Sequence, residues 1–278
     1  MSPHGATAVA ALVRNLPALR AAVLDLMRSL NDPNVDAAEL AQKISHDQAM
    51  AAKTLRLANS SFFGLSRQVM AISEATAIIG MHTVRSIALG AGLVDAFEAD
   101  RCQRFNLAAF WRHAIGTALC AEALAPCFDA ESGIAFGFGL MHDIGRVALA
   151  SAMPEQYSDA LRLRARDDLP LMIAEREMLG FTHADVGAAL AERWLLPTSL
   201  VDAIRYHHEP PDKSSLLIDI THLADNLAHA LDLGAEIDDV VPPLSSLAWQ
   251  RLHAVEPRLP HVLHETETRH AALCQALL

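Results

Sequence analysis

Histidine is the most conspicuous source of chemistry in this chain, because 14 histidines occur among 278 residues. A subset of them forms, with two aspartates, a series along the sequence. Imidazole and carboxylate groups suit zinc, iron, manganese or nickel, whereas calcium takes oxygen ligands and would not recruit this much imidazole. We therefore predict a site for a divalent transition metal. Its candidate ligands are His113, His142, Asp143, His183, His207, His208 and Asp225.

Helical spacing would turn several of these side chains inward. His113 is in line with Phe110 and Thr117 on the apolar stripe of its predicted helix. His183 stands in the first turn of another helix, where the helix dipole disfavours imidazolium and favours the neutral, ligating form. Asp225 adjoins a further apolar stripe. A carboxylate in that position is costly unless it is paired or binds a metal ion.

Each residue also has a purely structural explanation. An inward-facing histidine is commonly a hydrogen-bonded core residue, and Asp225 could accept a bond from a neighbouring backbone N–H. The His207–His208 pair could be an exposed helix end, where histidine complements the helix dipole. His222 and His229 flank Asp225 at helical spacing. We expect these two to be exposed, with a supporting role around the ligands as the alternative.

Other chemical motifs are absent or weak. The sequence has no G-x-G-x-x-G, G-x-x-x-x-G-K-[ST] or G-x-S-x-G segment, although a Ser-His-Asp arrangement stays open. Arg162, Arg164 and Arg166 alternate ahead of two aspartates. We expect them to form a solvated helix face, with an anion site as the alternative.

The segments that must position these residues are helical nearly throughout. Aromatic residues make up only 5% of the chain, and strand-like alternation rarely exceeds four residues. A capping residue followed three residues later by an acid is typical of a helix start, and the sequence has this pattern at Asp36 with Glu39 and at Thr182 with Asp185. The sequence predicts an all-α fold. The expected helices cover residues 18–30, 36–45, 48–58, 71–80, 82–97, 106–125, 130–141, 144–151, 154–167, 170–179, 183–195, 198–206, 215–232, 244–253 and 256–276.

Composition limits the class of protein. Hydrophobic residues make up 52% and charged residues 20%, which excludes intrinsic disorder as a description of the whole chain. The net charge of −11 disfavours a direct nucleic-acid partner or an anionic membrane surface, because clustered Lys and Arg bind both. No apolar run reaches the ~18 residues that span a bilayer, and no secretory signal is recognisable. We expect a cytoplasmic protein whose four cysteines are reduced core residues.

Charged residues near 100–104 separate two helical blocks, which we interpret as the joint between two lobes. The predicted organisation is an N-terminal helical lobe over 1–100, a second lobe over 101–233 and a C-terminal helical extension over 234–278. The acidic, proline-containing segment Gly234–Ser246 favours a mobile connection. The sequence leaves open whether 234–278 completes the fold or covers a cleft, and it does not indicate the oligomeric state.

A set of short segments, in a shared order and spacing, resembles the HDOD family of bacterial signalling proteins over about residues 16–212. The resemblance implies an all-helical fold in which the N-terminal lobe packs on a lobe related to HD-type metal phosphohydrolases. It also implies a regulatory role in signal transduction, including cyclic di-GMP pathways, through protein contacts. The matching segments are Leu16–Pro17, Ile44–Asp47, Leu57–Ser60, Ala75–Gly80, Phe110–His113, Gly139–Gly145, Glu177–Gly180, His183–Gly187, Trp194–Pro197 and Ile204–His208.

The resemblance assigns the candidate ligands to two sets. His113, His142, Asp143 and Asp225 match the basic HD ligand set, whereas His183 and the His207–His208 pair match the extra histidines of the related HD-GYP phosphodiesterases. Two features depart from those enzymes. Arg146 replaces a lysine, which changes reach and geometry, and Pro-Pro-Asp-Lys follows Glu209 in place of a substrate-recognition loop.

We therefore expect a regulatory or adaptor protein that binds unidentified signalling proteins without turnover, with a metal ion in the HD-like lobe. The alternative is a metal-dependent phosphohydrolase for a nucleotide or cyclic di-GMP, in which Asp143 and Arg146 have catalytic roles. In that case His183, His207 and His208 would hold a second ion, and Arg146 would steady the phosphate. A sensor that binds a nucleotide or cyclic dinucleotide without hydrolysis is a third possibility.

Overall fold

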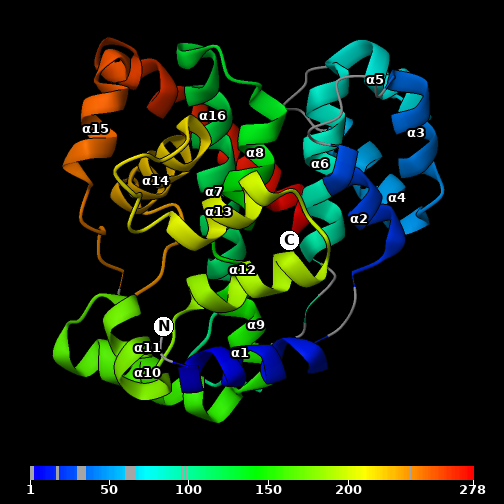
Figure 1. Ribbon diagram of the computed structural model, residues 1–278. Helices are drawn as coiled ribbons and strands as arrows, with labels where there is room; N and C mark the ends of the chain where they lie inside the picture. Colours follow the sequence, from blue (N-terminus) through cyan, green and yellow to red (C-terminus); the bar gives the residue numbers. More distant parts are fainter. Residues whose placement is uncertain are drawn as a thin grey trace.

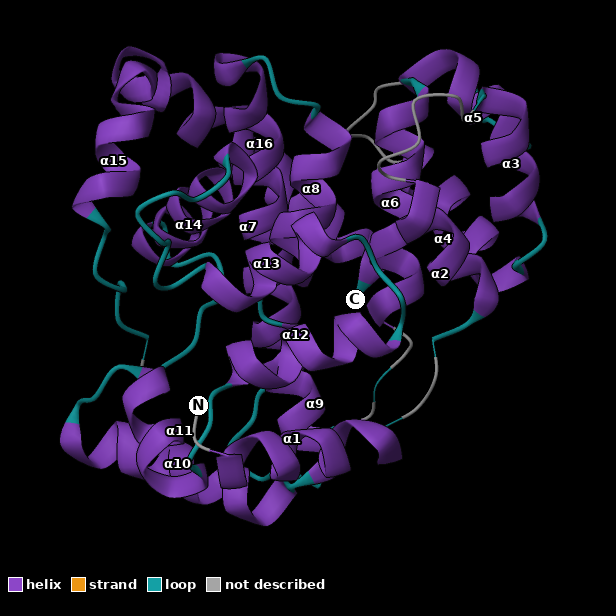
Figure 2. Cartoon of the chain, in the orientation of Figure 1, coloured by secondary structure: helices purple, strands orange, loops and turns teal. Residues whose placement is uncertain are grey.

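Helices make up all the regular structure in the described part of the chain (Figure 2). The structure is a computed structural model that describes residues 3–16, 19–29, 36–59, 67–94, 97, 99, 101–237 and 239–278. No strand occurs within these residues, so the predicted all-α fold is confirmed. Among the same residues, no helix combines the length and apolar character that crossing a membrane requires.

Helices α2 to α6 form an N-terminal lobe that gathers on one side of the molecule (Figure 1). Asp36 and Asp47 begin α3 and α4, because their carboxylates accept hydrogen bonds from the backbone N–H groups of Glu39 at 2.7 Å and Met50 at 3.0 Å. The apolar faces of these helices pack together into a core. The helices are α2 (Ala21–Arg28), α3 (Ala37–Ser45), α4 (Gln48–Ala58), α5 (Ile72–Ile79) and α6 (Met81–Val94).

Helix α7 (Leu107–Leu124) lies at the centre of the second lobe, because α8, α14 and α16 all pack against it. Asn106 caps its first turn by accepting a hydrogen bond from the backbone N–H of Ala109 at 3.0 Å. Most of its side chains are buried, as expected for a helix enclosed on several sides. The other elements are η2 (Ala125–Phe128), α8 (Ser132–Met141), α9 (Ile144–Ala152), α10 (Pro154–Asp167), α11 (Leu171–Leu179), α12 (His183–Arg193), α13 (Thr198–Tyr206) and α14 (Leu216–Ala230).

The C-terminal segment contains α15 (Ser246–Leu252), η3 (His253–Arg258) and α16 (Leu259–Leu277). Helix α16 packs on α7 of the second lobe and on α4 and α6 of the N-terminal lobe, so it joins the two lobes. One core cluster also extends from Val23 in α2 to Ile204 in α13. The segment after residue 234 therefore completes the fold through α16.

Helix α1 (Pro3–Asn15) was not among the predicted helices. It lies apart from α2 to α6 and packs against α12 and α9, where Val9 and Val13 are buried (Figure 1). Arg193 at the end of α12 donates a hydrogen bond to the backbone carbonyl of Leu16 at 2.9 Å. These contacts attach the start of the chain to the second lobe.

The remaining predicted helices agree with the observed ones to within a few residues. The helix expected over 18–30 is α2, and the one expected over 82–97 is α6. Residues 18, 30, 95 and 96, and Asp100 at the predicted joint, lie outside the described residues. The boundaries of the three predicted domains stay predictions.

Candidate metal centre

His142 and Asp143 lie between two consecutive helices, where the chain passes from the end of α8 to the start of α9. Two glycines allow the close packing that buries this junction. A Cβ at Gly139 would stand 2.7 Å from the Cα of Ala118 in α7, and one at Gly145 would stand 1.9 Å from the backbone oxygen of His183. The absence of side chains at these positions brings α8 against α7 and α9 against the start of α12.

A capping box determines the position of His183 at the first turn of α12, as the sequence predicted. The Thr182 side chain accepts from the backbone N–H of Asp185, and the Asp185 carboxylate accepts from the backbone N–H of Thr182 at 3.0 Å. Glu175 of α11 adds a second restraint, because one of its carboxylate oxygens accepts hydrogen bonds from both the backbone and the ring of His183.

The structure brings all seven predicted ligand residues into one cluster, although their role as ligands stays a prediction. Asp143 occupies one half of it. Its Oδ1 atom lies 3.1 Å from Nε2 of His183 and 3.4 Å from Nε2 of His207, and its Oδ2 atom lies 3.7 Å from Nε2 of His142. His208 lies beside His183, with their Nε2 atoms 3.0 Å apart.

Asp225 of α14 occupies the other half of the cluster. Its Oδ1 atom lies 3.0 Å from Nε2 of His113 and 3.2 Å from Nε2 of His142. Its Oδ2 atom lies 3.8 Å from Nδ1 of His208, which has the most exposed side chain of the seven at 18%. His142 therefore contacts both aspartates and connects the two halves.

Several histidines in the cluster have their ring orientation and proton position determined by an acceptor behind the ring. In each case Nδ1 faces a backbone carbonyl or a carboxylate, so Nδ1 carries a proton and Nε2 is the nitrogen left to bind a metal ion. This arrangement is typical of histidines that bind metal ions. The pairs are His142 with the Gly139 carbonyl at 2.6 Å, His207 with the Ile204 carbonyl at 2.8 Å, His183 with Glu175 at 2.7 Å and His229 with Asp239 at 2.7 Å.

Unsatisfied polar atoms at the centre of the cluster fit a metal ion. Among the described residues, Asp143 Oδ1, His207 Nε2 and Asp225 Oδ2 are buried without a hydrogen-bond partner of acceptable geometry. The Nε2 atoms of His113 and His142 lie only 3.3 Å apart, and two nitrogen lone pairs at this distance repel unless a cation or proton lies between them. The described residues thus contain a histidine–aspartate cluster that can bind metal.

Electrostatics favour a cation in the same place. Burial opposes protonation of His183, but Glu175 and Asp143 outweigh this effect and raise its pKa to about 10, contrary to the neutral form expected from its place in the first turn of α12. Burial also lowers the pKa of both His207 and His208, which keeps these two rings neutral and able to ligate. The negative charge at the cluster thus attracts a positive charge, and two neutral imidazole rings are present to ligate it. Such a site is suited to binding a metal cation.

Two expectations about neighbouring residues were wrong. His222 is completely buried, donates from Nδ1 to the His207 carbonyl at 2.6 Å, and accepts from the backbone N–H of Ser245 at 2.9 Å. His229 is also largely buried, with a side chain only 10% exposed, and its Nε2 atom lies 3.3 Å from Asp225 Oδ1. Both histidines face inward because the segment after α14 covers them.

Arg164 likewise departs from the expected solvated face, whereas Arg162 and Arg166 are exposed. The Arg164 side chain is 8% exposed and contacts Glu236 at 3.6 Å and Asp239 at 3.4 Å. The acidic segment 234–246 was expected to be a mobile connection. The carboxylates of Glu236 and Asp239 instead form partly buried ion pairs with the second lobe.

A cavity of about 370 Å³ opens onto the cluster. Asp143, His183 and His208 are among its lining residues, and apolar side chains line much of the rest. Arg146 also lines this cavity and is already paired, with Nη1 3.2 Å from Asp143 Oδ2 and Nη2 3.0 Å from Glu236. Residues 239–243 form part of the wall, so the C-terminal segment covers a cleft as well as completing the fold.

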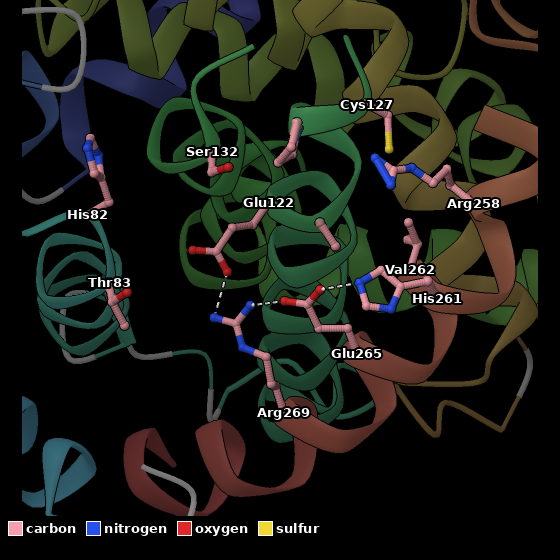
Figure 3. A pocket seen from close by; sticks show the side chains of 12 residues that line it. His82, Thr83, Glu122, Cys127, Ser132, Arg258, His261, Val262, Glu265 and Arg269 are labelled. Atoms are coloured by element: carbon pink, nitrogen blue, oxygen red, sulfur yellow. Dashed lines mark hydrogen bonds and ion pairs between the residues drawn. The ribbon is translucent and has the colours of Figure 1, made fainter. Parts of the chain in front are cut away.

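A larger cavity of about 550 Å³ lies elsewhere, where α6, α7, η2, α8, η3 and α16 meet (Figure 3). It shares no lining residue with the cavity at the cluster. Arg269 projects into it and joins Glu122 at 2.6 Å and Glu265 at 3.1 Å, and His261 approaches Glu265 from the other side. Among the described residues, none of the groups that could hold a metal ion comes from this cavity, so the candidate chemistry lies at the histidine cluster.

Sequence analysis gave His229 a supporting role only as the alternative, and it missed the carboxylates that support the cluster. His229 had a usable signal, because it stands four residues after Asp225 on the same helix face. Glu175, Glu236 and Asp239 had none, since they come from segments whose contact with the cluster arises only in the folded chain.

Comparisons with known protein families and sequences agree with these observations. The family model described as HDOD domain matches residues 16–210. An uncharacterized protein of Treponema pallidum is 28% identical over 254 residues, covering 90% of this chain and 48% of that protein. Ribonuclease Y of Thermus thermophilus is 29% identical over 145 residues, covering 52% of this chain and 20% of the enzyme. The chain thus spans about half or less of the length of these curated relatives.

Solved structures share the fold. An HDOD domain protein of unknown function from Geobacter sulfurreducens has a TM-score of 0.75 at 23% identity, covering 94% of this chain and 98% of that one. A protein of Shewanella amazonensis, provisionally described as a phosphohydrolase, has a TM-score of 0.73 at 24% identity, covering 98% of both chains. A Marinobacter aquaeolei protein, provisionally described as a signal transduction protein, has a TM-score of 0.79 at 21% identity, covering 94% of this chain and 60% of that one.

Proposed function

The chain belongs to the HDOD domain family, and on that premise we propose that it is a signal-transduction regulator that binds divalent transition metal and acts through protein contacts. The observation that carries the metal-binding part is the buried cluster, in which His142, His183 and His207 turn their Nε2 atoms inward. The N- and O-donor set suits iron, manganese, zinc or nickel. The partners would be other signalling proteins.

The charge distribution around the cavity supports regulation in preference to turnover. Besides its metal ion, phosphoester hydrolysis is helped by a cationic side chain that is free to bind the phosphate. Arg146 and Arg164 are the arginines that line the cavity, and both are paired with carboxylates of the segment after α14. The absence of the recognition loop after Glu209 agrees with this reading.

The residues of the chain have separate tasks in this proposal. Asp143 and Asp225 supply the negative charge that attracts a cation, and the histidines supply neutral nitrogen donors. Glu236 and Asp239 connect the centre to the segment that forms part of the protein surface, where Ile237 is 99% exposed. Metal occupancy would thereby influence a surface that a protein partner can contact.

The test compares the metal-loaded protein with Asp143→Asn in two assays. In the first, each is incubated with cyclic di-GMP and with nucleoside monophosphates, and we expect no product from either. In the second, each is used to capture proteins from cells of the source organism, and we expect a defined partner to be retained by the wild type and lost with Asp143→Asn. Equal capture by both proteins would contradict a metal-dependent regulatory role.

A metal-dependent phosphohydrolase is the second candidate, and the cavity that reaches Asp143, His183 and His208 favours it. A bound divalent ion would supply Lewis-acid activation of water and of a phosphoryl oxygen. In this alternative, Asp143 holds the ion. Arg146 orients the phosphate after its ion pair with Glu236 is broken. Hydrolysis that disappears in Asp143→Ala, while circular dichroism shows an intact fold, would establish this function. Binding of a cyclic dinucleotide without product, measured by calorimetry, would indicate a sensor.

A further inference from the structure

His229 is placed where a ligand of the cluster would be, although the resemblance to HD-type proteins does not include it. It follows Asp225 by one helical turn on α14, so both side chains project from the same face. Its Nε2 atom lies 3.3 Å from Asp225 Oδ1, and its ring centroid lies 4.3 Å from that of His113. The side chain is only 10% exposed.

Among the described residues, the donor atoms form four groups that overlap, and the two groups at opposite ends of the cluster are joined by the two groups that contain His142. At one end, atoms of Asp143, His183, His207 and His208 lie within 4.8 Å of one another. At the other end, atoms of His113, Asp225 and His229 also lie within 4.8 Å of one another. These two groups have no residue in common, so the cluster offers two places for an ion.

The two ends are built in the same way. At the first, the Glu175 carboxylate lies 2.7 Å from Nδ1 of His183, and at the second the Asp239 carboxylate lies 2.7 Å from Nδ1 of His229. A carboxylate behind an imidazole determines its tautomer and raises its basicity as a ligand. At the second end, Asp225 Oδ2 is also buried without a hydrogen-bond partner.

We propose that His229 is a metal ligand, oriented by Asp239, and that with His113 and Asp225 it forms a second metal position. The inference rests on the proposed metal-binding function and adds to it a position that depends on residues beyond the family match, which ends at residue 210. Two imidazoles and one carboxylate suit zinc, iron, manganese or nickel. Asp239 thereby makes the segment after α14 a functional part of the centre.

The experiment measures metal content and affinity of the full chain without any activity assay. Tag-free wild type, His229→Gln, Asp239→Asn and the control His264→Gln are loaded with Zn²⁺ and analysed by plasma mass spectrometry, and Co²⁺ binding is followed by visible absorption against a competing chelator. His264 is an exposed residue of α16. We expect two equivalents in the wild type and control, and one fewer in His229→Gln. Asp239→Asn should lower the affinity for one of the two ions by about 10–100-fold.

The outcomes separate this inference from the proposed function. If the wild type binds metal and His229→Gln binds the same number of ions with the same affinity, the second position is refuted and the metal-binding function stands. If the wild type binds no metal, both fail. If His229→Gln does not fold, Asp239→Asn decides, because affinity equal to that of the wild type would refute the role of Asp239 and of the histidine that it orients.

Discussion

Glu175 and His183 are joined by two hydrogen bonds that end on a single carboxylate oxygen. Glu175 Oε2 accepts from the backbone N–H of His183 at 2.8 Å and lies 2.7 Å from its Nδ1 atom. Both side chains are buried, so water does not compete for these bonds. The pair fixes the start of α12 and directs Nε2 of His183 toward Asp143, whose Oδ1 atom is 3.1 Å away.

Glu175→Gln should lower metal affinity by about 10–100-fold, because an amide is a weaker acceptor and orients the ring less firmly. Competition with a chelator measures this change. Glu177→Gln is the matched control, since Glu177 is exposed on the same helix. Equal affinities for the two variants would show that Glu175 does not support the metal centre.

Gly145→Ala should separate α9 from α12 and destabilise the fold. The added Cβ would stand 1.9 Å from the backbone oxygen of His183, and the backbone cannot move aside as a flexible side chain can. Overpacking typically lowers the free energy of unfolding by about 1–3 kcal/mol, and we expect a decrease toward the upper end of that range, measured by urea unfolding.

Gly90→Ala provides the comparison for this prediction. Gly90 also lies within a buried helix, but the nearest atom to an added Cβ is the end of the Leu277 side chain at 2.9 Å. That side chain can rotate away, and alanine is favoured over glycine in a helix by about 1 kcal/mol. Equal destabilisation by the two substitutions would contradict the close approach of α9 and α12.

The sequence contained enough information for the helices and for the seven candidate ligands. Helical periodicity and capping residues such as Asp36 and Thr182 are local features, and the structure has helices starting where they predict. Histidine and aspartate are recognisable as ligand types without knowledge of the fold. Helix α1 was missed, although its buried residues Val9 and Val13 form the face that packs on α12.

The environment of the cluster was harder to predict because it depends on contacts between distant segments. Arg164 and His229 look exposed from their local sequence, and each is covered by Asp239 from beyond α14. Glu175 has no distinguishing local pattern, and its role appears only when α11 packs beside the start of α12. Residue types therefore indicated the ligands, while tertiary packing determines which groups orient them.

The cysteines provide a test of the packing. Burial raises the pKa of Cys120 to about 12 and that of Cys274 to about 12, so both thiols stay protonated at pH 8. Cys102 is also buried, whereas Cys127 is partly exposed. A short pulse of iodoacetamide at pH 8, followed by peptide mass spectrometry, should modify Cys127 first. Rapid modification of Cys120 in the folded protein would be inconsistent with its buried position within α7.

The central claim is that the histidine–aspartate cluster is a metal centre, and metal analysis of the tag-free protein beside Asp143→Ala tests it most directly. Asp143 contacts His142, His183 and His207, so its loss should remove bound metal. We expect one or more equivalents of iron, zinc, manganese or nickel in the wild type, and a lower metal content in a variant whose circular dichroism shows an intact fold. A wild type that stays metal-free after loading, or a variant with unchanged metal content, would contradict the claim.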